Sequence, residues 1–178
     1  MFRKNVSLRF KSIITDLSLP GLLKVGEILC APSEEDDRES KEELEKRLSA
    51  CEKEVYEYIS AAELSGDGTQ ISLVYEDNLG AEGKCINMIN FNTNASECVR
   101  LVRDGAITSS MIFNKKDPFS RCSYNVSSIP LEFGIYTRAV DNKLTENGGS
   151  LMLDYVLEIR GHKVQRCQTF INILSRGK

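Results

Sequence analysis

The sequence is poor in the residues on which many active sites depend. Its 178 residues include no tryptophan, four prolines and a single histidine, His162. Serine or cysteine catalysis assisted by histidine would have to use His162, which lies in a predicted exposed turn, Arg160-Gly161-His162. The glycines are dispersed among turns, so no glycine-rich phosphate loop is predicted. We therefore predict no catalytic residue and favour a protein that is not an enzyme, although a pair of carboxylates stays open.

Long apolar stretches are also missing. No run of 18 apolar residues occurs, so we expect no membrane-spanning helix. The basic start, Met1 to Lys11, lacks the unbroken apolar stretch of about 7–15 residues that an export signal needs. We therefore expect a cytoplasmic protein.

The cysteines do not form a metal-binding pattern. The six are widely spaced, no Cys-x-x-Cys pair occurs, and one histidine is too few for a zinc site of usual spacing. We expect reduced thiols that serve as small core residues, with no metal and no cofactor. These cysteines are Cys30, Cys51, Cys85, Cys98, Cys122 and Cys167.

Length and charge indicate one ordinary globular domain over residues 1–178. Hydrophobic residues make up 41% of the chain and charged residues 28%. The formal net charge of −3 argues against a chain built to wrap nucleic acid. Whether the protein is a monomer or a homodimer stays open.

One segment differs from the rest. Residues 34–54 contain ten acids and five bases. Within it Leu44, Leu48, Cys51 and Val55 recur at helical spacing, which predicts an amphipathic helix near residues 39–53. We expect this inserted helix to lie on the surface, either as a solvated insertion or as a lid or dimer contact.

Most of the remaining chain alternates between apolar and polar residues. The clearest case runs from Leu151 to Ile159, where apolar side chains occupy every second position. Turn signals such as Asp104-Gly105 separate the alternating stretches. Strands with one wet face belong to antiparallel sheets, and closing a long sheet removes its edges. We predict an all-β, up-and-down antiparallel barrel of about 8–10 strands with one inserted helix.

The same stretches resemble a known family. From residue 70 onward the chain is similar to the YwiB-like bacterial proteins of unknown function, and residues 31–55 depart from them as an insertion. The resemblance implies a cytoplasmic bacterial protein with a calycin-like (lipocalin-like) barrel and brings no catalytic residues. It is carried by Ile71 to Glu76, Val99 to Gly105, Pro130 to Thr137 and Gly149 to Leu157, with the opening strand Val6 to Asp16 also similar.

The inner face of such a barrel is where a small molecule could bind. Tyr75, Tyr124 and Tyr155 each share a face with aliphatic neighbours, and Thr137 ends an apolar face that begins at Leu131. A buried phenol needs a polar partner, which could be a ligand, an ordered water or a backbone carbonyl. These four residues are candidates for binding a small amphipathic or anionic ligand.

Arg103 is the fifth candidate. It follows Val99 and Leu101 on an apolar face and directly precedes the Asp104-Gly105 turn. There its guanidinium could bind a carboxylate or phosphate at the barrel mouth. Alternatively, it forms an internal ion pair with Glu76 or Glu132, or extends into solvent.

A different function would use the outside of the barrel. Basic residues gather near the C-terminus from Arg160 to Lys178, and Lys115, Lys116 and Arg121 form a second group. If they share a face, they could dock RNA or an acidic protein. We favour solubilising surface charge, and we take a small-molecule binding module as the main hypothesis.

Overall fold

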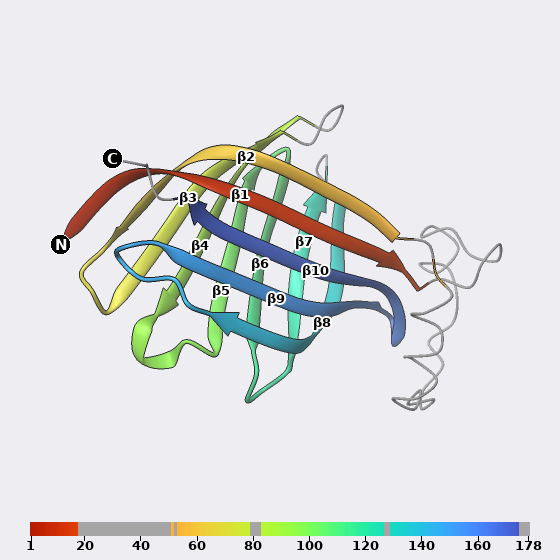
Figure 1. Ribbon diagram of the computed structural model, residues 1–178. Coiled ribbons are helices and arrows are strands. Elements are labelled where there is room, and N and C mark those ends of the chain that lie inside the picture. Colours follow the sequence, from red (N-terminus) through yellow and green to blue (C-terminus); the bar gives the residue numbers. More distant parts are fainter. Residues whose placement is uncertain (18–50, 52, 79–82, 127–128, 175–178) are drawn as a thin grey trace.

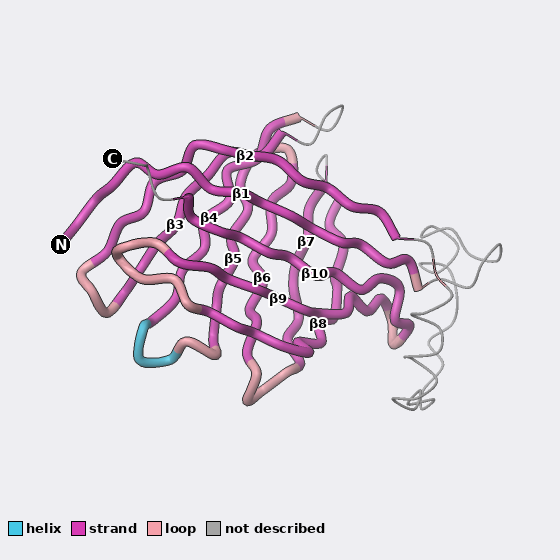
Figure 2. The backbone as a smooth tube through the Cα atoms, in the orientation of Figure 1, coloured by secondary structure: helices cyan, strands magenta, loops and turns pink. Residues whose placement is uncertain are grey.

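The computed structural model describes residues 1–17, 51, 53–78, 83–126 and 129–174. Nearly all of these residues lie in long strands, and the described part contains one short 3-10 helix, Thr93–Ala95 (Figure 2). The strands are β1 (Phe2–Asp16), β2 (Lys53–Gly66), β3 (Gln70–Asn78), β4 (Lys84–Asn92), β5 (Cys98–Gly105), β6 (Ile107–Asn114), β7 (Phe119–Val126), β8 (Ile129–Asn142), β9 (Gly149–Ile159) and β10 (His162–Leu174).

The ten strands form one closed antiparallel barrel (Figure 1). Each strand pairs with its neighbours in the sequence, and β1 closes the circle by pairing with β10 over Ser7 to Asp16. This confirms the predicted all-β fold, its up-and-down topology and the strand count. Closure leaves no long exposed edge that could pair with another chain.

Alternation along each strand separates the inside of the barrel from its outside. In β6 the burial alternates strictly, with Ile107, Ser109, Met111 and Phe113 buried and facing inward. The inward residues of all ten strands form one continuous hydrophobic cluster, which includes Leu8, Leu64 and Leu153. Burial of these side chains is the main stabilising contribution expected for the fold, at roughly 25 cal/mol per Å² of apolar surface.

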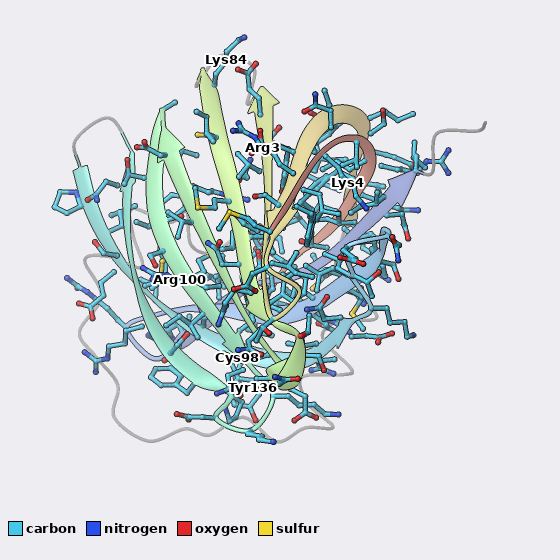
Figure 3. All side chains as sticks on the ribbon, turned by 90° about the vertical axis from the view of Figure 1, so that its left-hand side faces the viewer. Arg3, Lys4, Lys84, Cys98, Arg100 and Tyr136 are labelled. Carbon is cyan, nitrogen blue, oxygen red and sulfur yellow. The ribbon has the colours of Figure 1, made fainter. Side chains whose placement is uncertain are left out.

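The two ends of the barrel carry different connections. One, here called the Gly105 end, carries the connection from β5 to β6 and those after β1, β3, β7 and β9. The other, the Thr93 end, carries the connections after β2, β4, β6 and β8. In Figure 3, Lys84 at the start of β4 marks the Gly105 end, whereas Cys98 at the start of β5 lies at the opposite end.

Most of the predicted helical insertion lies outside the described residues. The predicted helical stripe extends too far along the chain, because β2 begins at Lys53 and Val55 is an exposed strand residue. Because Lys53 to Glu57 are all exposed, this first part of β2 lacks the alternation of buried and exposed residues that marks the other strands. Cys51 is described and packs against Leu17 and Val156 on the outer side of β9.

Two irregularities interrupt the ladders that β9 forms, one with β10 between Lys163 and Gln165 and one with β8. The second lies in β8, where Arg138 falls between the pairs Thr137–Tyr155 and Ala139–Asp154. Arg138 lies 3.8 Å from the Asp154 carboxylate through its Nε, and Arg166 donates to both oxygens of the same carboxylate at 2.9 and 2.6 Å. This outer cluster ties β8, β9 and β10 together.

Candidate functional site inside the barrel

A row of polar side chains crosses five neighbouring strands on the inner face. Tyr75 pairs with Asn87, Asn87 with Arg103, Arg103 with Ser109, and Ser109 with Tyr124. Residues that pair directly across adjacent strands place their side chains on the same face, about 5 Å apart. These five residues are called the polar row. The row joins three of the predicted site residues, Tyr75, Arg103 and Tyr124, in one continuous surface.

Arg103 is the charged centre of the polar row. Its Nε donates a hydrogen bond to Asn87 Oδ1 at 3.1 Å, while the half-buried side chain keeps some accessible surface. The groups that act on it electrostatically are Tyr155, Tyr75, Tyr124 and Asp77. The fourth predicted residue, Tyr155, therefore belongs to the same cluster, although it lies on β9.

The predicted ion pair of Arg103 with Glu76 or Glu132 is wrong. Glu76 binds Lys84 at 2.7 Å, and Glu132 binds Arg121 at 3.3 Å. Both acids have even positions in strands whose odd positions face inward, so they lie on the outer face of the barrel. Among the described residues, Arg103 has no carboxylate within ion-pair distance, so contact with a ligand and extension into solvent are the two hypotheses that remain for it.

Two further members of the polar row contain buried polar atoms without partners. Asn87 is fully buried, and its Nδ2 makes no hydrogen bond. Ser109 is 4% exposed, and its Oγ likewise has no partner. The hydroxyl of Tyr58 on β2 is also buried, but it lies close to the Asp77 carboxylate, which raises its pKa. A buried polar group without a hydrogen bond costs about 1–3 kcal/mol, so the two in Asn87 and Ser109, on either side of one cation, require an explanation.

The tyrosines around Arg103 are uncharged at neutral pH. Burial is the largest cause of the raised pKa of Tyr75, and the same holds for Tyr155 and Tyr58. Arg103 opposes the shift in each case but does not reverse it. These phenols therefore remain hydrogen-bond donors and do not neutralise the guanidinium.

The charge of Arg103 itself is retained. Burial alone lowers the pKa of Arg103, whereas Tyr155, Tyr75, Tyr124 and Asp77 raise it, and the net direction is upward. An arginine is protonated at any physiological pH in either case. The site therefore presents a permanent positive charge next to several neutral donors, an arrangement that suits an anion.

The interior on the two sides of the polar row differs in packing. Toward the Thr93 end the next inward row is Leu73, Ile89, Leu101 and Met111, all buried. Toward the Gly105 end the inward Cys85 and Ile107 are buried, whereas Ile14, Tyr58 and Leu157 are half-buried and retain accessible surface. The accessible part of the inner face therefore lies on the Gly105 side of the polar row.

Thr137, the fifth predicted site residue, has a different role. It is buried opposite Tyr155, but its Oγ1 accepts a hydrogen bond from the backbone N–H of Asn114 at 3.3 Å. Its own backbone N–H donates to Pro118 O at 2.7 Å. Thr137 thus links β8 to the end of β6, where β6 and β7 have stopped pairing.

The surface features considered in the sequence do not form a charged interface in the described part of the chain. Lys115 and Lys116 both lie near Glu97, at 3.9 and 3.4 Å, and Arg121 lies near Glu132. Arg166 is held by Asp154. These four basic groups are at least partly balanced by acids, whereas Arg176 and Lys178 of the C-terminal group lie outside the described residues, and docking of RNA or an acidic protein stays a prediction.

His162 is not the exposed turn residue that the sequence suggested. It begins β10, pairs with Ile159 and is half-buried. The tight turn consists of Arg160 and Gly161, both at positive φ, so the strand begins one residue earlier than expected.

No group of three His, Cys, Asp or Glu side chains in the described ranges could hold a metal ion. No helix in those ranges has the length and hydropathy to span a membrane.

Polar residues that interrupt apolar strand faces are the sequence signal for part of this site. Asn87 and Ser109 interrupt apolar faces in β4 and β6, and each pairs directly with Arg103 of β5. This pairing depends on the strand register, which the sequence of a single strand does not give. Tyr58 lies in an exposed, charged segment, where its inward direction gave no signal.

Comparison with known proteins identifies relatives of this fold. A family model described as a domain of unknown function (DUF1934) matches residues 44–171. The crystal structure of ywiB protein from Bacillus subtilis is similar, with a TM-score of 0.60 and 16% sequence identity, over 97% of this chain and 94% of that one. Among curated proteins, none matches. The resemblance of the sequence to the YwiB-like proteins is confirmed.

Proposed function

Because this chain belongs to the family described as a domain of unknown function (DUF1934), we propose its function from the geometry of its own site. The protein is a non-catalytic binding module that takes a small amphipathic or anionic molecule into the barrel. The molecule lies between the polar row and the Gly105 end. Arg103 and Tyr75 contact its polar part, and Tyr124 and Tyr155 complete the site.

One observation carries this proposal: the Arg103 guanidinium lies inside the barrel with a neutral amide as its hydrogen-bonding partner. Moving a cation out of water costs several kcal/mol unless a charge or several hydrogen bonds compensate. Tyrosines that stay protonated supply no charge, and the Asp77 carboxylate acts on Arg103 without forming an ion pair or a hydrogen bond with it. A bound anion would supply the missing compensation.

The side chains of the site suit binding better than chemistry. They comprise phenols with raised pKa values, an amide, a hydroxyl, a guanidinium and one carboxylate, Asp77. Catalysis by general acid and base needs a group whose pKa lies near the working pH. The tyrosine pKa values move away from neutrality, so these residues are suited to donating hydrogen bonds in a fixed geometry.

The proposal is tested by native mass spectrometry of the protein purified from its own host. We expect a population of the wild-type protein to carry a small molecule, and the Arg103→Met variant to carry none. Arg100→Met is the matched control, because Arg100 is an exposed arginine on the same strand that donates to Ser110 Oγ at 3.2 Å. An unliganded wild-type protein, or a ligand equally retained by Arg103→Met, would refute the proposal.

A further inference from the structure

We infer that the ligand presents one carboxylate to Arg103, held end-on by the two terminal nitrogens of the guanidinium, and that its apolar part points toward the Gly105 end. This inference rests on the proposed function and specifies the chemistry of its ligand. It is carried by the hydrogen bonding of Arg103, by the charge count of the site and by the packing on either side of the polar row.

The hydrogen bonding of Arg103 leaves one side of its guanidinium for a ligand. Its Nε donates to Asn87 Oδ1, which occupies the edge that combines Nε with one terminal nitrogen. The remaining edge consists of Nη1 and Nη2, whose parallel N–H bonds match the two oxygens of a carboxylate. Asn87 thus fixes the guanidinium plane and thereby the orientation of the bound group.

Neighbouring groups add donors around the same point. The Nδ2 of Asn87 and the Oγ of Ser109 are buried and unpaired. The strong acceptor of the polar row, Asn87 Oδ1, is already used by Arg103. A group with several acceptor oxygens and no donor therefore fits this cluster, whereas an amide or an ammonium group would leave donors unpaired or bring charges of like sign together.

The charge count favours a single negative charge. Arg103 is the cation of the cluster, and the other groups acting on it are three neutral phenols and Asp77, so the protein's own charges sum to zero. A monoanion in contact with Arg103 leaves the site with one net negative charge. A dianion such as a phosphate monoester would add a second negative charge near Asp77 in a partly buried site, which is unfavourable.

Packing determines the direction of the remaining part of the ligand. The row on the Thr93 side contains Leu73 and Ile89, which are 0% and 1% exposed, so it leaves no surface for an apolar group to contact. Ile14, Tyr58 and Leu157 on the other side retain accessible surface. Covering this apolar surface stabilises the bound state at roughly 25 cal/mol per Å².

The test uses three probes of similar shape at pH 8, where benzoate has one negative charge, benzamide none and phenyl phosphate about two. Binding is measured by the rise in the midpoint of thermal unfolding as each probe is titrated. We expect benzoate to raise the midpoint in the wild-type protein and in Arg100→Met, and to have no effect on Arg103→Met. Benzamide and phenyl phosphate should give much smaller shifts.

A second variant tests the charge count without removing the arginine. Asp77→Asn removes the one negative charge among the groups that act on Arg103, so benzoate should bind about threefold or more tightly. Phenyl phosphate should gain more than benzoate, because its extra charge is repelled more strongly. Unchanged or weaker benzoate binding by a folded Asp77→Asn variant would contradict the charge argument.

Orientation is tested by intermolecular nuclear Overhauser effects from the ring protons of bound benzoate. We expect them at the methyl groups of Ile14 and Leu157, and their appearance at Leu73 instead would overturn the assigned direction. If native mass spectrometry shows an Arg103-dependent ligand while phenyl phosphate or benzamide binds better than benzoate, the proposed function holds and this inference fails. If no probe binds and no host molecule is retained, both fail.

Discussion

Replacing Arg103 by methionine is expected to stabilise the unliganded protein. Most substitutions of an interior residue destabilise a fold, because they leave a cavity or an unpaired group. Methionine keeps the length and most of the apolar surface of the arginine stem, so little packing is lost. The guanidinium, by contrast, is held inside the barrel by a single hydrogen bond to a neutral amide.

The expected magnitude is a small difference between opposing contributions. Removing a poorly compensated charge from the interior relieves a penalty of about 3–5 kcal/mol, taken at the low end because Arg103 is only half-buried. Losing the bond to Asn87 and leaving its Oδ1 unpaired costs about 2–3 kcal/mol. The net gain in the free energy of unfolding is about 0–1 kcal/mol, which corresponds to a midpoint up to about 4 °C higher for a chain of this length.

Urea denaturation followed by circular dichroism measures this gain. Arg100→Met serves as the control and should stay within about 0.5 kcal/mol of the wild type, because Arg100 is exposed. A double variant, Arg103→Met with Asn87→Leu, should be more stable still, since it also removes the unpaired amide. A fall in stability of more than about 1 kcal/mol for Arg103→Met would refute the reasoning, because it would show that the arginine is a satisfied structural group.

Three further predictions concern the scaffold. Gly149→Ala should destabilise the barrel by more than about 2 kcal/mol in urea denaturation, because Gly149 has a φ of 118° and a Cβ would lie 2.1 Å from Lys143 O. The control Gly68→Ala should cost only about 1 kcal/mol, because Gly68 has a φ of 94° but open space around it, and equal losses would contradict the steric argument. Asp154→Asn should lower the free energy of unfolding by about 3–5 kcal/mol, because the mostly buried Arg138 and Arg166 lose their shared carboxylate. A loss below about 1 kcal/mol would show that solvent compensates the two arginines. In a spectrophotometric titration the buried tyrosines (Tyr58, Tyr75, Tyr155) should ionise only on unfolding. The free energy of unfolding should decline above about pH 10, because these residues lose protons in the unfolded chain but keep them in the folded one. Their ionisation in the native protein at that pH would contradict the raised pKa values.

Four of the five predicted site residues belong to one cluster. Alternation in single strands was enough to place Tyr75, Tyr124 and Tyr155 on apolar faces and Arg103 at the end of another. Thr137 shared the same pattern, yet its hydroxyl accepts a backbone hydrogen bond where the ladder between β6 and β7 has ended. Alternation reports which face a side chain occupies and carries no information about its hydrogen-bond partner.

Two members of the polar row were missed for a related reason. Asn87 and Ser109 are ordinary polar residues within apolar stretches, and nothing in their own strands distinguishes them from a structural amide or hydroxyl. They become part of a site because the register sets them on either side of Arg103. The wrong assignment of Glu76 and Glu132 as ion-pair partners arose in the same way, from chain proximity without knowledge of the face.

The amino-acid sequence by itself determined the strands, their antiparallel order and the inward direction of the alternating side chains, because a period of two is a local property of an extended chain. Only the tertiary structure decided which inward residues stand at the same height, since register and closure depend on pairing between strands far apart in the sequence. The polar row exists at that level alone. It spans five strands, and no one strand contributes more than one of its residues.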